Sequence, residues 1–262
     1  MDLALAFQRS FARRQAHQVI DVPGGCCVLD PRYPASYHHN RLIISGRPTA
    51  DEIIAAAEAT LGGSGLGHRM LVIEDDVHGT ACAQALAAAG YQHESNLVMR
   101  HPGGGTGRPA DPAIRVGPVS VADLSQATHD EWRANLPDAD ESVLTQLVAR
   151  RATLADGADQ VQFLAVRDPD GRVLSHADLY LHPAAEGPGR VAQIEDLVTG
   201  AEHTGHGYAG AILAEALRLA EDAGCDLVFL VADGDGWPQH WYRRLGFAPI
   251  GRFHGFIRPG QT

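Results

Sequence analysis

Two glycines, Gly205 and Gly207, stand where a polar loop runs into a helix predicted over 207–223. Glycine lets the backbone approach a ligand closely. A helix N-terminus presents unpaired N–H groups and about half a positive charge, so a phosphate placed there gains several hydrogen bonds. These residues predict a pyrophosphate site. The pattern alone is weak, because glycine is also common in ordinary turns and helix caps.

Further segments follow the glycine loop at fixed distances: an apolar strand, a polar loop at 233–236 and the sequence WPQHWYRRLGF. With them the chain resembles the GNAT (Gcn5-related N-acetyltransferase) superfamily. In that family the acetyl-CoA loop reads Arg/Gln-x-x-Gly-x-Gly/Ala, and a later helix carries Tyr four residues before Gly-Phe. Here 204–209 and 242–247 occupy those places. The resemblance covers roughly 113 to 262 well and the first 100 residues only weakly.

The resemblance implies acetyl-CoA as cosubstrate. A strand at 197–199 would hydrogen-bond the pantetheine arm through its backbone, as an added β-strand does; a plain buried strand is the alternative. Thr204 replaces the family's Arg or Gln, and Asp235 stands where many relatives carry Asn, which leaves the affinity for CoA open. Asp233 and Asp235 could instead form a solvated turn. The implied acetyl-CoA contacts are Leu197, Val198, Thr199, Thr204, Gly205, His206, Gly207, Tyr208, Ala209 and Asp235.

Two catalytic residues follow from the same resemblance. Tyr242 is the expected general acid, donating a proton or hydrogen bond to the departing sulfur; aromatic packing is its alternative role. Glu195 is the expected base that deprotonates the amine, with a pKa raised by desolvation; pairing with an arginine or a backbone group is the alternative. Strand alternation places Glu195 on the same face as Leu197 and puts Asp196, the fallback base, on the other. The family also implies that the Val198 N–H polarises the thioester carbonyl.

The hydrophobic pattern predicts the elements that must position these residues. Strands and helices alternate through the second half, and the first half shows a shorter echo of the same order. The second half is expected to form strands at 113–119, 161–168, 171–183, 191–199, 225–233 and 247–259, and helices at 122–136, 141–154, 207–223 and 238–245. The first half is expected to form strands at 41–45, 68–74 and 94–100, and helices at 51–61 and 77–89.

The echo indicates an internal repeat. The distance from Leu42 to Gly90 equals that from Val198 to Gly246. The predicted fold class is α/β (α+β), with two tandem GNAT-like domains, each a mixed, mostly antiparallel sheet flanked by helices. The predicted boundaries are a degenerate domain at 1–100, a Gly/Pro-rich linker at 101–112 and the acetyltransferase domain at 113–262. Coincidence of two unrelated α/β units is the alternative.

The first half lacks the glycine loop at the equivalent place. Thr49 and Glu52 have the spacing of a capping box, which satisfies the helix N–H groups by side chains, and Pro48 removes a donor. We therefore predict that residues 1–100 do not bind acetyl-CoA. They would instead complete the acceptor pocket or support the active half.

Composition excludes several classes of function. A net charge of -11 without a basic run argues against a nucleic-acid surface. The sequence contains no apolar run long enough to predict a membrane span, and its N-terminus does not resemble a signal peptide. The four scattered cysteines fit neither a disulfide framework nor a zinc site. The 14 histidines show no metal-ligand spacing, so no metal site is predicted. A cytoplasmic protein is expected, and a homodimer is left open.

The acceptor is less well specified than the cosubstrate. Helices at the start of this fold usually line the acceptor site, which makes Trp132, Asp138, Asp140 and Glu141 possible substrate contacts. Trp237 and Trp241 are expected in the core or the pocket wall. The leading hypothesis is an N-acetyltransferase acting directly on a small amine; Cys225, away from the motif, disfavours a cysteine nucleophile. The alternatives are a protein amine as acceptor, or an inactive CoA-binding or interaction module.

Overall fold

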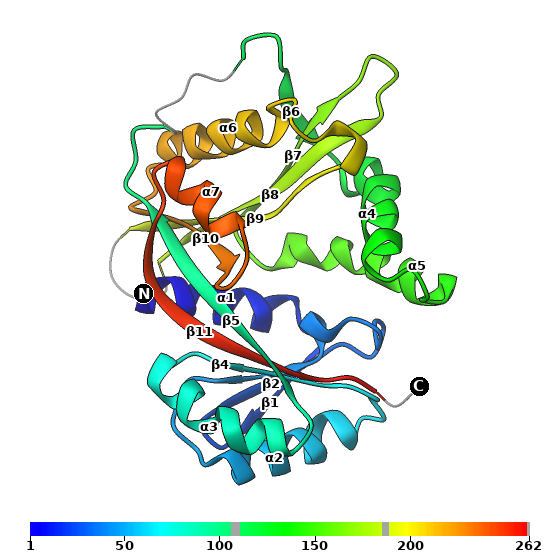
Figure 1. The fold of residues 1–262 in the computed structure, drawn as a ribbon, viewed down its shortest axis with the longest axis vertical. Helices are drawn as coiled ribbons and strands as arrows, with labels where there is room; N and C mark the ends of the chain where they lie inside the picture. The colour runs from blue at the N-terminus through cyan, green and yellow to red at the C-terminus, as the bar shows by residue number, and fades with distance from the viewer. Residues whose placement is uncertain (106–110, 185–188, 261–262) are drawn as a thin grey trace.

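The structure is a computed structural model and describes residues 1–105, 111–184 and 189–260. Helices and strands alternate through both halves of the chain (Figure 1). The N-terminal half contains α1 (Asp2–Gln15), β1 (Gln18–Val22), β2 (Gly25–Leu29), η1 (Tyr37–His39), β3 (Arg41–Ile44), α2 (Ala50–Ala57), η2 (Glu58–Gly62), β4 (Arg69–Ile73), α3 (Asp76–Ala88) and β5 (Gln92–His101). The C-terminal half contains β6 (Val116–Val119), α4 (Val121–Asn135), α5 (Glu141–Ala149), η3 (Arg150–Asp156), β7 (Gln160–Arg167), β8 (Val173–Pro183), β9 (Arg190–Thr199), η4 (Ala201–His203), α6 (Tyr208–Asp222), β10 (Leu227–Asp233), α7 (Pro238–Arg244) and β11 (Ala248–Arg258).

The strands of both halves form one sheet of 11 strands in the order β1-β2-β3-β4-β11-β5-β10-β9-β8-β7-β6. The last strand of each half is exchanged: β11 lies between β4 and β5, and β5 lies between β11 and β10. Figure 1 shows β5 and β11 side by side at the centre of the molecule, where they connect the two halves. The pairing is antiparallel except for β3 with β4 and β9 with β10.

The predicted class, a mixed and mostly antiparallel sheet flanked by helices, is confirmed. The echo between the halves is visible in the structure, because each half has one parallel pair followed by a helix and an exchanged strand. Gly90 and Gly246 follow α3 and α7 with φ of 87° and 94°, a conformation that favours glycine at helix ends. The repeat and the domain boundaries remain a prediction, and residues 106–110 of the linker lie outside the described part.

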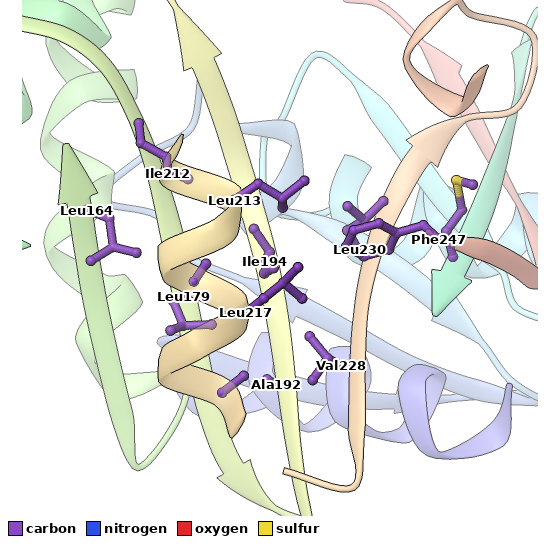
Figure 2. Packing of buried hydrophobic residues seen from close by; sticks show 14 of the residues in the cluster. Leu164, Leu179, Ala192, Ile194, Ile212, Leu213, Leu217, Val228, Leu230 and Phe247 are labelled. Carbon is purple, nitrogen blue, oxygen red and sulfur yellow. The ribbon is translucent and has the colours of Figure 1, made fainter. Parts of the chain in front are cut away.

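Helix α6 covers one face of the C-terminal strands. Its apolar side chains Ile212, Leu213 and Leu217 point at the strands, where Leu179 and Ile194 meet them (Figure 2). Together with the buried Ala216 and Ala220 these helix residues follow the i, i+1, i+4, i+5, i+8 spacing that places side chains on one face of a helix. The cluster fixes the helix against β8 and β9, and with it the position of the glycine loop at its N-terminus.

The opposite face is covered in part by α1, a helix that the sequence analysis did not predict. Phe7 lies edge-on to Phe229, with ring centroids 5.8 Å apart, and Phe11 stacks on Tyr180 at 4.4 Å. The N-terminal helix therefore packs on strands of the C-terminal half. Strands β1 and β2 were missed as well, although β2 is almost entirely buried.

In the part of the chain that the structure describes, no helix is long and apolar enough to cross a membrane.

Candidate active site

Strand β9 separates from β10 half-way along its length. The two strands pair in parallel from Val191 with Leu227 to Ile194 with Leu230, and then β10 continues against β5 while β9 continues only against β8. From Glu195 to Thr199 one backbone edge of β9 therefore has no neighbouring strand. Such an edge can accept an extended ligand as an added strand does. The predicted contacts Leu197, Val198 and Thr199 lie on this segment.

A β-bulge interrupts β9 at the start of the open edge. His176 pairs with Val198 and Asp178 with Glu195, so Ala177 faces two residues of β9. Asp196 in the bulge has φ 48°, in the left-handed region. Bulges reorient side chains next to active sites.

The bulge corrects the prediction of which side chains share a face. Leu197 packs against the α6 cluster, on the opposite side from Glu195, whereas Glu195 and Asp196 both line the same cavity. The expectation that Glu195 shares a face with Leu197 and that Asp196 points away was wrong. It assumed a regular alternation, which the extra residue breaks.

The glycine loop leaves the N-terminus of α6 without a side-chain cap. Gly207 at the N-cap has φ 83° and Gly205 has φ 82°. The first helical bond in this turn is from the Ala211 N–H to the Gly207 carbonyl. The Thr204 hydroxyl donates to the Ala201 carbonyl at 3.1 Å and so does not reach the helix. The amides of the first turn are thus available to an anion.

The equivalent helix of the N-terminal half is closed. Thr49 and Glu52 form the predicted capping box, with the Thr49 amide donating to Glu52 at 2.7 Å. The prediction of the capping box is confirmed. Gly46 donates from its amide to the Gly24 carbonyl at 2.8 Å, so the preceding loop is also satisfied by backbone.

A cavity of about 270 Å³ lies next to the open edge, with walls from both halves. The C-terminal half contributes Glu195, Asp196, Glu131, Trp132 and Arg150, among others, and the N-terminal half contributes residues of α1, η1 and β3–β5. The N-terminal contributions include Gln8, Phe11, Gln15, His38, His39, Arg41, Glu94 and Asn96.

Glu195 has the environment of a base. Burial, with the added repulsion of Asp196 and Asp178, raises the pKa of Glu195 to about 8, although the Gln193 amide donates a hydrogen bond to it. Burial and the Asp196 carboxylate likewise raise the pKa of Glu131 to about 7. A carboxyl group with a pKa near neutrality can exchange a proton with an amine at physiological pH.

Asp196 has a different environment. Its Oδ2 lies 2.9 Å from Nη1 of Arg151, and the same guanidinium also pairs with the buried Asp178. Burial opposes the ionisation of Asp196, but Arg151 and Arg150 outweigh it and lower its pKa. Asp196 is therefore an ionised partner of Arg151, which makes Glu195 the better candidate base.

Tyr242 lies on the α6 side of the open edge, packed against Phe247 with ring centroids 5.8 Å apart. Burial, and secondarily the Glu195 carboxylate, raises the pKa of Tyr242 to about 12. The phenol stays protonated at neutral pH and can act as a donor. Glu195 and Tyr242 thus approach the open edge from opposite sides of the sheet.

The remaining predicted residues divide into two groups. Trp132 lines the cavity, as expected. The exposed carboxylate of Glu141 instead pairs with Arg133 and His129 at the surface, and Asp138 and Asp140 do not line the cavity. Asp235 is exposed in a turn and donates its amide to Asp233 at 2.9 Å. Trp237 is 72% exposed, so its expected place in the core or pocket wall was wrong.

Sequence reasoning missed the charged residues that the N-terminal half brings to the cavity. Arg41 and His38 lie in and just before a short strand, and nothing in their spacing marks them. Phe11 could have been found, because Ala4, Leu5, Phe7, Phe11 and Ala12 have the apolar spacing of a helix face. Among the described residues no group of His, Cys, Asp and Glu could hold a metal ion, and the four cysteines are free.

Several solved structures share the fold across nearly the whole chain. A functionally unknown conserved protein from Staphylococcus epidermidis matches with a TM-score of 0.68 at 15% identity, covering 94% of this chain and 95% of that one. A GCN5-related N-acetyltransferase from Kribbella flavida matches with a TM-score of 0.63 at 18% identity, covering 98% and 96%. A GCN5-related N-acetyltransferase from Sphaerobacter thermophilus matches at 0.55 and 15%, covering 91% and 78%.

Of the two sequence comparisons, only the one with family models gives a match. No curated protein sequence matches the chain significantly. The sequence model of the acetyltransferase (GNAT) family matches residues 121–247, a segment that runs from the start of α4 to the residue before β11 and contains Glu195, the glycine loop and Tyr242. This part of the chain belongs to the acetyltransferase (GNAT) family.

Proposed function

We propose that the protein is an acetyl-CoA-dependent N-acetyltransferase that transfers the acetyl group directly to an amine of a small molecule. The observation that carries the proposal is the open edge of β9, which starts beside a carboxyl group in a cavity and leads to an uncapped helix N-terminus. Acetyl-CoA would supply an acyl thioester. Its long pantetheine arm matches the open edge of β9, and its pyrophosphate matches the uncapped N-terminus of α6.

The residues of this chain fit that cosubstrate. The backbone of 197–199 offers hydrogen bonds along the open edge. The amides of the first turn of α6 suit the pyrophosphate, and Gly205 and Gly207 keep side chains away from it. Thr204 and His206 contribute backbone rather than long donor groups, because both side chains bond to nearby carbonyls.

The chemistry follows from Glu195 and Tyr242. Glu195 takes a proton from the ammonium form of the acceptor, which frees the nitrogen lone pair to attack the thioester carbonyl. The carbon–nitrogen bond forms as the carbon–sulfur bond breaks, and Tyr242 donates a hydrogen bond or proton to the departing sulfur. The nitrogen loses its second proton as the amide forms, and that proton replaces the one given to the thiolate. An amide N–H on the open edge, that of Val198 in the family pattern, would polarise the carbonyl oxygen.

The cavity favours a small acceptor over a protein amine. Its walls come from both halves of the chain, and α1 packs on the same face of the sheet and forms part of the wall. A volume of about 270 Å³ lies just below the usual range for drug-sized ligands, roughly 300–1,000 Å³. Asp235 remains a proposed contact of the pantetheine from its exposed turn.

Calorimetric titration with acetyl-CoA tests the cosubstrate site. Gly207→Trp places a side chain at φ 83° over the start of α6, so we expect it to abolish binding. Gly171→Trp is the matched control, because Gly171 has φ 88° in the distant turn between β7 and β8. Absence of wild-type binding would refute the proposal and favour an interaction module, and equal binding by both variants would move the site elsewhere.

A further inference from the structure

Two arginines stand in the wall of the acceptor cavity without a carboxylate partner. Arg41 opens β3 of the N-terminal half, and Arg150 follows α5 of the C-terminal half. Each has a buried Nε with no hydrogen-bond partner, and neither forms an ion pair within the described ranges. Burying a cation without a counter-charge is costly. Two such groups at one cavity indicate that an anion completes them.

The side chain bonded to Arg41 is a histidine, and the Glu195 and Glu74 carboxyl groups act on Arg41 only from beyond ion-pair distance. The Arg41 Nη1 lies 2.8 Å from Nδ1 of His38. His38 is exposed and accepts this bond, because a guanidinium can only donate. Burial, with the charges of Arg150 and Arg41, lowers the pKa of the neighbouring His39 to about 3, so that ring is neutral. Burial also lowers the pKa of Arg41 to about 10, which leaves it charged at neutral pH.

Arg150 is held by stacking. Its guanidinium lies 5.5 Å from the centre of the Trp132 ring, which orients the group and leaves its N–H donors directed elsewhere. The neighbouring Arg151 shows the contrast, because it is fully engaged with Asp178 and Asp196. Of these adjacent arginines only Arg151 forms ion pairs among the described residues, whereas Arg150 acts on the Asp196 and Glu131 carboxyl groups from a longer distance.

Carboxyl groups occupy the same cavity. Glu195, Asp196 and Glu131 line it together with the two arginines. A cavity lined by both cations and carboxyl groups is complementary to a ligand that carries both an anionic group and an ammonium group. The guanidinium fork matches a carboxylate through two N–H bonds, and the small volume fits a single metabolite.

We infer that the acceptor is an amino-acid-like zwitterion whose carboxylate is bound by Arg41 and Arg150 while its amine is presented to Glu195. The inference rests on the proposed acetyltransferase function and specifies its substrate class. It also gives the N-terminal half a role in substrate selection, through a residue of β3.

The test is a comparison of matched acceptors. The common amino acids are assayed for acetyl-CoA-dependent thiol release alongside their primary amides and their decarboxylated amines. We expect kcat/KM for the preferred amino acid to exceed that of its amide by roughly 100-fold, the scale of a buried charge pair losing one partner. Arg41→Gln and Arg150→Gln should each remove most of that preference, lowering kcat/KM for the acid much more than kcat/KM for the amide.

Controls separate selectivity from folding. Arg47→Gln, an exposed arginine of the same half that pairs with Asp75 at 2.7 Å, should leave both acceptors unaffected. Arg41→Lys should restore part of the preference. Each variant must retain calorimetric binding of acetyl-CoA, and Arg150→Gln provides the second test should Arg41→Gln fail to fold.

The inference would be overturned if amides or decarboxylated amines reacted as well as the amino acids. It would also be overturned if Arg41→Gln and Arg150→Gln lowered kcat/KM equally for all acceptors. Failure of every amino acid to react, with acetyl-CoA still bound, would overturn it too. In these cases the cosubstrate site stands. Loss of acetyl-CoA binding by the wild type is a separate result, and it refutes the proposed function itself.

Discussion

The guanidinium of Arg151 lies 2.9 Å from Asp196, a non-glycine residue held at φ 48° in the bulge of β9. Arg151 also pairs with Asp178 on β8, which in turn accepts a hydrogen bond from Tyr180 at 2.9 Å. One buried cation thus links the two strands across the bulge. The bulge places Glu195 and Asp196 together in the cavity, so this link positions the proposed base.

Arg151→Met tests the link. Removing one partner of a buried ion pair leaves uncompensated charge, so we expect the free energy of unfolding to fall by about 3–5 kcal/mol. Urea denaturation measures it. Arg167→Met is the control, since Arg167 is partly exposed and pairs with Asp123 at 2.9 Å; its cost should stay within about 1 kcal/mol. Equal effects of both variants would contradict a structural role for Arg151.

The pH dependence of the rate tests Glu195. A base with a pKa of about 8 is protonated below that value, so kcat/KM should rise with pH up to about pH 8. Glu195→Gln should lower the rate roughly 10²- to 10⁴-fold and abolish this rise. Glu202→Gln, an exposed carboxylate paired with Arg172, should keep the wild-type profile. Persistence of the same rise in Glu195→Gln would assign it to another group.

The pH dependence of stability gives an independent check on Glu195. Its folded-state pKa of about 8 lies above the ordinary value of 4.5, so the folded protein keeps a proton that the unfolded chain loses between these values. Stability is therefore lost as pH rises from about 4.5 to about 8. Glu195→Gln removes this loss. Its Tm should match the wild type near pH 4.5 and exceed it near pH 8; a constant difference would contradict the shift.

Tyr242→Phe tests the donor to the sulfur. Loss of the phenol should lower kcat roughly 10²- to 10⁴-fold with little change in acetyl-CoA affinity, because only the transition state loses the interaction. Tyr91→Phe is the matched control, a buried tyrosine of the other half whose hydroxyl has no hydrogen-bond partner. An unchanged kcat in Tyr242→Phe would leave the aromatic as a packing residue.

The exchanged strands predict that the halves depend on each other. A fragment that begins after Gly105 lacks β5, the strand between β10 and β11, and should fail to show a cooperative thermal transition. Supplying residues 1–105 on a separate chain should restore it, as judged by near-UV circular dichroism. The control is the folded full-length protein whose backbone is cleaved after Gly105. Cooperative folding of the fragment alone would show that β5 is dispensable.

The sequence predicted most elements because their periodicity is local. The helix expected at 122–136 is observed as α4, and the strand at 191–199 as β9. Pairing was a different matter, since nothing local states that β5 lies beside β10 rather than next to a strand of its own half. The bulge at Asp196 was missed for a related reason: alternation of residue types does not reveal an added residue.

The candidate site shows the same division. Glu195, Tyr242 and the glycine loop were found because their order along the chain matches a family pattern. Arg41 and Phe11 were missed because the fold alone brings them to the cavity, from segments more than 100 residues away from Glu195. Their contribution comes from long-range packing, which a single sequence does not encode in any short window.

Strand β5 carries side chains for two separate cores. Leu97 and Met99 belong to the cluster beneath α6, and Val98 belongs to the cluster beneath α1. Its two edges pair with β10 and with β11. Inserting or deleting a single residue in β5 would therefore turn its side chains from one core to the other and shift its register with both neighbouring strands. This strand is where the chain should tolerate length variation least, and the exposed turn at Gly171 is where the same change should be harmless.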